Sequence, residues 1–514
     1  MIVNRFLTMF EVSQKQSYIF GSNKLKENII NSSVIAWIMS QEYFEEVIDD
    51  ETIFNKRDNL VYSGGGHIVL EFSTREKAVD FSKKITFEVH KCYPDIELFT
   101  TTMEYDCEKN PGDNLKKLTA KLEAKKSVRS SVFHQGTFGV EKIDASTLKP
   151  VFLCDEAILK IPEMEEKTDK ELMPSGYHRA YKFEELGGTK NEHNFIAVIH
   201  IDGNAMGKRV EKLIAASANL SWEEYKRKMQ SFSKAIDQDF KSAYKDMNET
   251  VVKNIESQKL DCLDLKGKKF PVRRIITAGD DICFVSDGRI GIECAVSFIK
   301  SLNSKKNAED QEGYSACAGV AIVHQKYPFY RAYELAEMLC GNAKKFGASL
   351  SVDGTGSDIS AIDWHIEYGE MKDNLEEIRQ GYETLDEKRL EMRPYIVCAS
   401  DRIKEMEPVR NYANFRKLVK KIQNNEIAYA RGKMKELRSV LKSGEKATGY
   451  YLEFNKIEDI MLESYQEIYK KISIDQIGSG KGLERKIFLE TADGMERSIL
   501  FDALEVSDTF IDLD

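Results

Sequence analysis

The sequence lacks the features that mark secreted, zinc-clustered or membrane-spanning proteins. Its nine cysteines, among 514 residues, show neither the paired spacing of a metal site nor the density of a disulfide framework. Such usage suits a reducing compartment, so we expect a cytoplasmic protein. No stretch is long and apolar enough to span a membrane, and the N-terminus has no signal-peptide layout. We therefore expect no membrane partner.

An excess of positive charge is also missing. The chain has 75 Lys and Arg against 85 Asp and Glu, for a formal net charge of −10. This balance argues against a protein that coats nucleic acid by bulk electrostatics, and against a processive polymerase with a basic template channel. With 42% hydrophobic residues, the length leaves room for about three ordinary domains with proper cores.

The most informative segment present is a predicted β-hairpin with two acids at its turn. Two apolar, β-rich runs, residues 275–277 and 282–285, flank Ala278-Gly279-Asp280-Asp281. Glycine lets the backbone turn tightly and lets a ligand approach closely. Adjacent carboxylates next to an apolar core repel each other unless a cation neutralises them, and hard oxygen ligands suit Mg²⁺ or Mn²⁺. A solvated hairpin turn explains this segment alone equally well.

A second acid ends an upstream strand. Residues 195–201 form an apolar run that delivers Asp202 into the loop Gly203-Asn204-Ala205-Met206-Gly207, which a helical pattern follows. Backbone N–H groups at such a loop and helix start can hold phosphate. Together with Asp280 and Asp281, Asp202 completes a set of three carboxylates that could bridge two metal ions for nucleotidyl transfer.

A third element adds a lysine. After an apolar strand at residues 318–323, Pro328 is well placed to start a helix that runs to a C-cap at Gly347. Lys344 or Lys345 could reach nucleotide phosphates from its last turn, although a lysine there also simply complements the helix dipole. The order of these elements predicts a ferredoxin-like palm over residues 191–370.

An earlier segment repeats this layout. Residues 62–70 (Tyr-Ser-Gly-Gly-Gly-His-Ile-Val-Leu) can be aligned with residues 276–284, and each segment precedes a helix and a strand. In this alignment Gly66 and His67 stand where the paired acids stand in the later copy. The first copy therefore predicts a palm that lacks these metal ligands.

The strand before that hairpin is repeated too. Residues 6–13 resemble the strand that ends at Asp202, so that Ser13 is aligned with this acid. The glycine-rich loop Ser63-Gly64-Gly65-Gly66 still allows backbone amides to approach a phosphate or a base.

These motifs resemble the large polymerase/cyclase subunit of type III CRISPR effector complexes. The resemblance rests on the tandem palms, on residues 201–207, on the helix end Ala343-Lys344, and on residues 16–27, which are similar to the family's N-terminal signature. It covers residues 1–105 and 190–370. The later palm is also similar to GGDEF-type diguanylate cyclases.

The resemblance implies an enzyme that joins ATP, or another NTP, 3′–5′ into cyclic oligonucleotide second messengers for antiviral defence. It implies that Asp202, Asp280 and Asp281, with Gly203, hold two Mg²⁺ or Mn²⁺ ions. Nucleotide contacts are then expected from the following residues: Gly203, Asn204, Ala205, Met206, Gly207, Ala278, Gly279 and Lys344. A second nucleotide pocket is expected at Ser33, Ser63, Gly64 and Gly65.

The sequence also departs from that family. Ala278 replaces the first glycine of the usual Gly-Gly-Asp-Asp, no Cys-X-X-Cys pairs are present, and no HD nuclease domain is expected ahead of the first palm. Two alternatives stay open: AMP transfer to a different nucleophile, and a non-catalytic nucleotide-sensing scaffold. RNA or CRISPR effector subunits are the expected activators, and the oligomeric state is open.

The predicted fold is therefore α+β, with two ferredoxin-like palms followed by a helical domain. We expect an inactive palm at residues 1–105, a connecting segment with a helix and an acidic loop at 106–190, the catalytic palm at 191–370, and a C-terminal helical domain at 371–514. The last part includes a basic run at 402–446, which could face RNA or a partner, and a core helix near residues 500–506.

Overall fold

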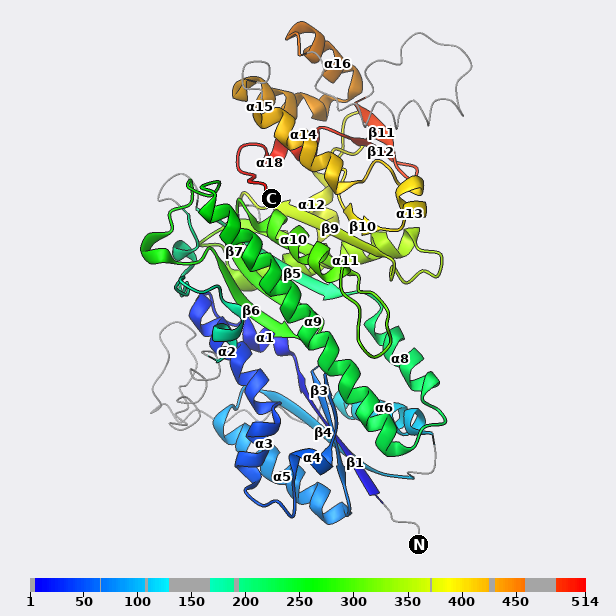
Figure 1. The fold of residues 1–514 in the computed structure, drawn as a ribbon. Coiled ribbons are helices and arrows are strands. Elements are labelled where there is room, and N and C mark those ends of the chain that lie inside the picture. The colour runs from blue at the N-terminus through cyan, green and yellow to red at the C-terminus, as the bar shows by residue number, and fades with distance from the viewer. Residues whose placement is uncertain are drawn as a thin grey trace.

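The computed structural model describes residues 5–64, 66–106, 110–128, 167–188, 194–369, 372–424, 430–457 and 487–514. Figure 1 shows the described chain as an elongated molecule, with one sheet at the N-terminal end, a second sheet in the middle and mostly helices beyond it. This mixed α+β architecture with two main sheets agrees with the prediction.

The first sheet has four strands in the order β2-β3-β1-β4. Its strands are β1 (Arg5–Ser13), β2 (Leu60–Gly64), β3 (His67–Phe72) and β4 (Glu97–Tyr105). The helices of this part are α1 (Lys15–Ile19), α2 (Leu25–Ile38), α3 (Gln41–Ile48), α4 (Lys56–Asn59), α5 (Arg75–Cys92) and α6 (Pro111–Ser127). A buried aromatic cluster that includes Phe10, Phe44 and Phe81 joins the sheet to α3 and α5.

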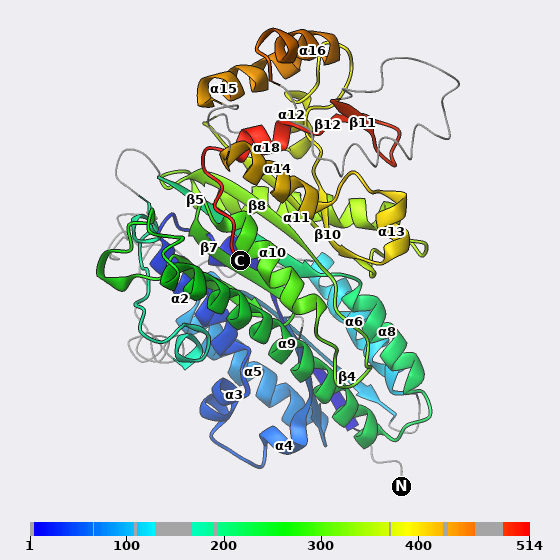
Figure 2. The same ribbon diagram turned by 45° about the horizontal axis from the view of Figure 1, so that its top comes forward.

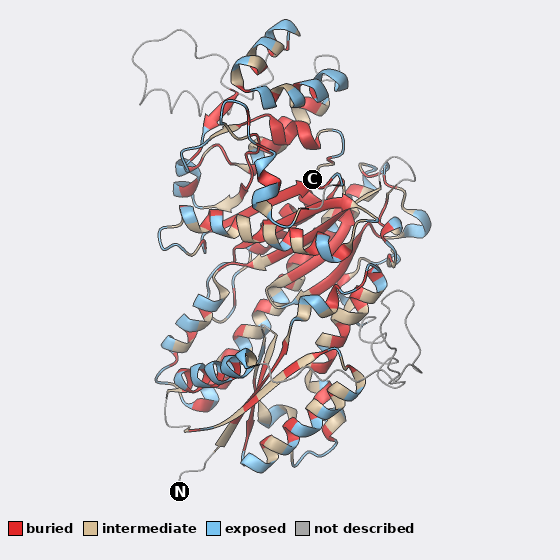
Figure 3. Cartoon of the chain, turned by 180° about the vertical axis from the view of Figure 1, so that it is seen from behind, coloured by how far each residue is buried: buried red, intermediate tan, exposed pale blue. Residues whose placement is uncertain are grey.

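The second sheet has six strands in the order β10-β9-β8-β5-β7-β6. They are β5 (Phe195–Gly203), β6 (Val272–Ala278), β7 (Asp281–Asp287), β8 (Ala316–His324), β9 (Ile359–Ile366) and β10 (Tyr395–Ala399). The helices are α8 (Met206–Ala216), α9 (Trp222–Glu256), α10 (Gly291–Asn303) and α11 (Phe329–Leu350). Its strands are almost wholly buried, as Figure 3 shows, because helices cover the sheet and the apolar runs need no solvent face.

The two sheets share one core topology. The order β2-β3-β1-β4 of the first corresponds to β6-β7-β5-β8 of the second, and in both sheets these strands pair antiparallel. The predicted repeat is thus present as two palm-like sheets. The predicted helix within residues 106–190 is α6, whereas the acidic loop predicted there lies mostly outside the described residues.

Helix α9 joins the two palms. It is 35 residues long, and Figures 1 and 2 show it running from beside β7 to the far end of the first sheet. Its first turns supply Trp222 and Lys226 to the buried carboxylate of Glu71 on β3, with Nε1–Oε2 and Nζ–Oε2 distances of 3.1 and 2.8 Å. Arg5 and Tyr105 of the first palm donate to the other oxygen of the same carboxylate.

The C-terminal part, predicted as a helical domain at 371–514, contains strands as well as helices. Strand β10 returns to the second palm and pairs antiparallel with β9, and a small hairpin is present as well. This part contains α12 (Leu375–Gln380), α13 (Asp401–Met406), α14 (Tyr412–Asn424), α15 (Arg431–Val440), α16 (Glu445–Phe454), β11 (Phe488–Glu490), β12 (Glu496–Ser498) and α18 (Phe501–Val506). The core helix expected near residues 500–506 is confirmed as the buried α18.

None of the described helices combines the length and the apolar character needed to cross a bilayer.

Candidate active site

Strand pairing brings the three predicted acids to one end of the second sheet. In the antiparallel register of β5 and β7, Asp202 is the partner of Asp281. Ala278 and Asp281 close a tight turn in which Gly279 has φ +64°, a conformation that favours glycine, and Asp280 is the other turn residue. The hairpin predicted from the sequence therefore exists, and its acids lie beside Asp202.

The hairpin turn is held against the end of β5. The N–H of Gly203 donates to the carbonyl oxygen of Asp280 at 3.2 Å. A Cβ atom at Gly203 would come within 3.0 Å of both the Asp280 Cβ and the Met206 Cγ. Glycine suits this position because any larger residue would have to displace the turn or the Met206 side chain by a few tenths of an ångström.

The environment of the paired acids disfavours their charged forms. Burial, followed by the charge of Asp202, raises the pKa of Asp280 to about 6 and that of Asp281 to about 7. Asp281 Oδ1 has no hydrogen-bond partner among the described residues. Its neighbour at 3.6 Å, the Nδ1 atom of His200, supplies no compensating charge, because burial lowers the pKa of that imidazole.

Lys344 is the cation that the structure places at the third acid. From α11, its Nζ lies 2.5 Å from Asp202 Oδ2 and 3.1 Å from the carbonyl oxygen of Gly203. Burial opposes the charge of Lys344, but the attraction of Asp202 outweighs it and raises the pKa of the ammonium. Of the two lysines that the sequence offered, Lys344 is thus the one at the acids, and Lys345 is exposed.

The carboxylate oxygens of Asp202, Asp280 and Asp281 are of the kind that bind a divalent cation, although the three side chains do not converge on one point in the structure. Across the described residues, no three His, Cys, Asp or Glu side chains are placed to hold a metal ion together. The oxygens present are nevertheless those that Mg²⁺ and Mn²⁺ prefer, and a cation would offset both the burial and the repulsion that raise the pKa values of Asp280 and Asp281. The Lys344 ammonium already bridges Asp202 and Gly203, two of the predicted metal ligands.

Part of the loop after β5 has a structural role, because it is held to the second sheet by hydrogen bonds. The side-chain amide of Asn204 is buried and donates to the carbonyl oxygens of Ile359 and Gly356, at 2.7 and 3.3 Å. Ala205 adopts φ +55° as the residue before α8, and a Cβ at Gly207 would meet no atom within 4 Å. Asn204 and Ala205 line a cavity of about 360 Å³ with Lys208 and Lys212. A contact between these loop residues and a nucleotide stays a prediction.

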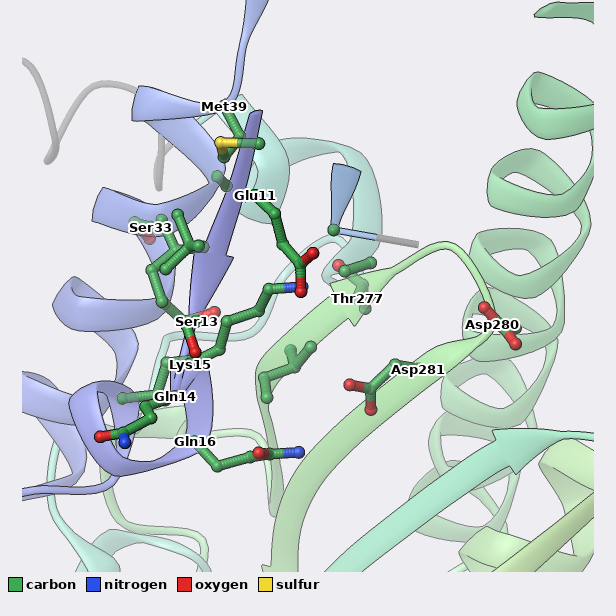
Figure 4. Close-up of a pocket in the computed structure, with 18 of the residues that line it drawn as sticks. Glu11, Ser13, Gln14, Lys15, Gln16, Ser33, Met39, Thr277, Asp280 and Asp281 are labelled. Carbon is green, nitrogen blue, oxygen red and sulfur yellow. The ribbon is translucent and has the colours of Figure 1, made fainter. Parts of the chain in front are cut away.

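A larger cavity of about 580 Å³ lies between the palms and reaches Asp280 and Asp281. In Figure 4, Lys15 and Asp281 extend into the space between the palms from opposite sides. Burial lowers the pKa of Lys15, whereas the charges of Glu11 and Asp281 oppose this shift. A Cβ at Gly66, where φ is +77°, would come within 1.5 Å of the Lys15 Nζ, so glycine makes room for this lysine.

The residues predicted to form a second nucleotide pocket do not lie together in the structure. Ser33 lines the cavity between the palms, but its hydroxyl donates to the Ile29 carbonyl oxygen at 3.0 Å. Ser63 and Gly64 pack instead on α9, where the hydroxyl of Ser233 donates to the Ser63 carbonyl oxygen at 2.5 Å. Gly65 lies outside the described residues. The structure thus brings Ser33, rather than the start of the glycine run, to the cavity.

The alignment of Ser13 with Asp202 needs correction. In the first sheet Glu11 pairs with His67, just as Asp202 pairs with Asp281 in the second. The residue at the position of Asp202 is therefore an acid, two positions before Ser13. Because strand partners and not sequence letters set this equivalence, the alignment of two short apolar runs missed it.

The first palm also repeats the lysine. Lys126, from α6, lies 2.8 Å from Glu11 Oε1, and His67 Nδ1 lies 3.2 Å from Glu11 Oε2. Burial alone would raise the pKa of Glu11, but the close contacts with His67 and Lys126 outweigh it and lower this pKa to about 2. Lys126 therefore pairs with Glu11 in the first palm as Lys344 pairs with Asp202 in the second. Each lysine belongs to the helix that follows the fourth core strand of its own sheet, α6 after β4 and α11 after β8.

Sequence reasoning missed Glu11, Lys15 and Lys126 as cavity residues. Lys126 was part of a basic amphipathic helix, and one turn of that pattern faces the cavity. Glu11 carried a weak signal, as the one acid in an otherwise apolar run. Lys15 lies two residues after the end of β1, and nothing in the sequence apart from this position indicated that it would line a cavity.

Comparison with known proteins shows which family the second palm resembles. Residues 195–349 match the family model described as Cas10/Cmr2, second palm domain. No curated protein matches the sequence. Solved structures do match, and their identities of 13–14% show a shared fold alone.

Three of these structures cover nearly the whole chain. A Csm1–Csm4 cassette in complex with pppApApA matches with a TM-score of 0.55 and 13% identity, over 99% of this chain and 69% of that chain. A Csm1–Csm4 cassette in complex with cA3 matches with 0.54 and 14%, over 98% and 69%. The Csm1–Csm4 subcomplex in the type III-A CRISPR-Csm interference complex matches with 0.51 and 13%, over 98% and 70%.

Proposed function

Because residues 195–349 form a Cas10/Cmr2 second palm domain, we propose that this chain is a metal-dependent nucleotidyltransferase. It joins ATP or another NTP through 3′–5′ linkages into cyclic oligonucleotides that act in antiviral defence. The observation that carries the proposal is the register that sets Asp202 opposite Asp281, with Asp280 and Asp281 on a cavity shared by two palms. A cavity of about 580 Å³ lies within the range of small-molecule sites.

In this proposal the two palms hold two nucleotides for one transfer. A 3′-hydroxyl attacks an α-phosphorus, the new phosphodiester forms, and pyrophosphate leaves. Mg²⁺ or Mn²⁺, held by Asp202, Asp280 and Asp281 with the Gly203 carbonyl, would supply the positive charge that nucleotidyl transfer requires. When a nucleotide binds, the Lys344 ammonium can leave Asp202 and donate to the outer phosphate oxygens instead. It is placed for this because it already lies beside the acids.

The first palm supplies charge and space to the same cavity. Lys15 faces Asp281 across it, and Lys126 lines it next to Glu11. Both lysines can attract the phosphates of the second nucleotide, and Gly66 leaves the necessary space. Since structures of the same fold are described as Csm1–Csm4 cassettes, we also infer a partner subunit of that kind.

The first test is a mass-spectrometric product assay. Purified protein is incubated with each NTP, singly and in mixtures, with Mg²⁺ or Mn²⁺, beside the double variant Asp280→Asn/Asp281→Asn. We expect cyclic or linear oligonucleotides from the native protein and at least a 100-fold loss in the variant, because removal of charge stabilisation at a transferring phosphoryl group costs about that much. The variant Asp261→Asn, which removes an exposed acid outside the site, is the matched control.

Other outcomes separate the alternatives. A nucleotide joined to a different acceptor would establish AMP transfer instead. Nucleotide binding without product, even with added RNA and partner subunit, would favour a sensing scaffold. Native product levels in the folded double variant would refute the site.

A further inference from the structure

A second cavity lies on another part of α11, away from the acids. It has a volume of about 880 Å³ and lies between α11 and the C-terminal part of the chain. Its walls come from α11, from the loop before β10 and from the β11–β12 hairpin, and they share no residue with the cavity between the palms. We call it the arginine pocket, after its basic lining residues: Lys345, Arg379, Arg389, Arg393, Arg410 and Arg497.

The lining of the arginine pocket has fewer acidic than basic residues. Only three acids line the pocket, namely Glu376, Glu391 and Asp493. Arg410 and Arg497 both depend on one oxygen of Asp493, with Nη2–Oδ2 distances of 2.9 Å each. Arg389 and Arg497 likewise share Glu391 Oε1, at 2.7 and 3.6 Å. Three guanidinium groups thus share two directly paired carboxylates, and Glu407, which does not line the pocket, adds a further attraction to Arg410.

Several guanidinium groups are buried with unused donors. Arg393 and Arg410 are only 2% and 3% exposed. The buried donors Nη1 of Arg379, Nη2 of Arg393 and Nε of Arg410 and Arg497 have no hydrogen-bond partner among the described residues. Burial, followed by the charge of Arg497, lowers the pKa of Arg410. The lining has six basic and three acidic residues, and an unbalanced positive charge that is partly buried is costly, so this lining favours an added anion.

Some of these arginines have a purely structural explanation. Arg393 is paired with Glu505 at 2.6 Å, and Arg379 with Asp363 at 2.7 Å, so these two form the wall. Arg389, Arg410, Arg497 and Lys345 remain for a ligand. Lys345 is exposed and makes no ion pair with any residue that the structure describes.

We propose that the arginine pocket binds the phosphate groups of a nucleotide, separately from the cavity between the palms. The planar fork of a guanidinium matches the oxygens of a phosphate, and two arginines that share one carboxylate can share a phosphate in the same way. The phosphates could belong to a free nucleoside triphosphate or to a short oligonucleotide that carries a 5′-triphosphate. The neighbouring residues Lys344 and Lys345 then serve two different sites from one helix.

The test is site-specific labelling of arginine with phenylglyoxal, read by mass spectrometry. The probes are inorganic tripolyphosphate, ATP and linear triadenylate with a 5′-triphosphate, each without added metal. We expect at least fivefold slower labelling of Arg389 and Arg497, whose side chains are 19% and 12% exposed, and no change at the exposed Arg75 of the first palm. Protection by all three probes indicates phosphate recognition, and protection by the triadenylate alone identifies an oligonucleotide site.

The second part of the test reverses the charge of Lys345, the exposed lysine at the edge of the arginine pocket. Lys345→Glu should raise the probe concentration needed for half-protection about tenfold, because it replaces an attraction by a repulsion. Lys326→Glu, at an exposed lysine outside the pocket, should leave it unchanged. Unslowed labelling of Arg389 and Arg497 with all three probes at saturation, or equal slowing at Arg75, would overturn the proposal. The same assay in Asp280→Asn/Asp281→Asn needs no turnover, so its result does not depend on the proposed reaction.

Discussion

At the residue scale, the most informative finding is that both palms carry the same acid–lysine pair. Asp202 with Lys344 and Glu11 with Lys126 hold equivalent places, on the first core strand and on the helix that follows the fourth. The first palm differs at the hairpin, where His67 and Gly66 replace the paired acids. The two palms therefore differ at the turn, while the acid–lysine pair beside the turn is present in both.

Glu11 should stabilise the fold through this pair. Its pKa is lowered to about 2, so its contribution is fully present above the ordinary carboxyl pKa and is lost as the pH falls toward 2. We expect Glu11→Gln to lower the free energy of unfolding by about 2 kcal/mol at pH 7, and by much less at pH 3. Urea denaturation at the two pH values measures this difference.

A surface acid provides the comparison. Glu76→Gln, at an exposed position of α5, should change the stability by less than about 0.5 kcal/mol at either pH. A Glu11→Gln effect equally small at pH 7, or one that does not decrease toward pH 3, would contradict the assigned role.

At the scale of elements, residues 16–27 tie the first palm to α11. Gln16 Nε2 lies 3.3 Å from Glu337 Oε1, and the ring of Phe20 stacks on Tyr333 with a centroid distance of 3.8 Å. Asn23 Oδ1 accepts from the Phe329 N–H at 2.9 Å and so caps the N-terminus of this helix. The segment that carries the family-like signature thus positions the helix that bears Lys344.

The cap can be tested by itself. Asn23→Ala should lower the free energy of unfolding by about 1 kcal/mol, because it leaves one N–H of the first helical turn without its acceptor. Asn23→Asp keeps an acceptor oxygen and adds a charge that the helix dipole favours, so we expect it to retain native stability. Thermal denaturation of both variants decides the matter, and equal losses would show that the side chain acts through something other than capping.

Periodicity and turn chemistry made the strands, the hairpin and the repeat predictable. Apolar runs of strand length and the Gly279 turn are local signals, and they were interpreted correctly. Three features depended on distant partners: the return of β10 to the second sheet, the equivalence of Glu11 and Asp202, and the burial of Asn204. These follow from strand register and tertiary hydrogen bonds, which no local pattern specifies.

At the scale of the whole molecule, a buried carboxylate joins the palms. Glu71 receives Lys226 and Trp222 from α9 and Arg5 and Tyr105 from its own palm. Burial opposes its ionisation, but these hydrogen bonds outweigh the penalty and lower the pKa of Glu71. One ionised side chain is therefore held by donors from both domains.

Removal of the interdomain lysine should weaken the whole fold. We expect Lys226→Met to lower the free energy of unfolding by about 2 kcal/mol, because the buried carboxylate loses one of its two direct ion pairs. Lys234→Met, at an exposed lysine further along the same helix, should be nearly neutral. Chemical denaturation gives both values, and a neutral Lys226→Met would mean that this ion pair contributes nothing to joining the palms.

Helix α9 has one more consequence, which concerns the distance between the two palms. A single 35-residue helix touches the first sheet through Ser63 and Leu60 and continues beside the second sheet, so it acts as a strut of fixed length. The two palms cannot move apart along this strut without breaking the helix or its contacts. The length of any ligand that contacts both palms at once is therefore limited by the fixed spacing between them.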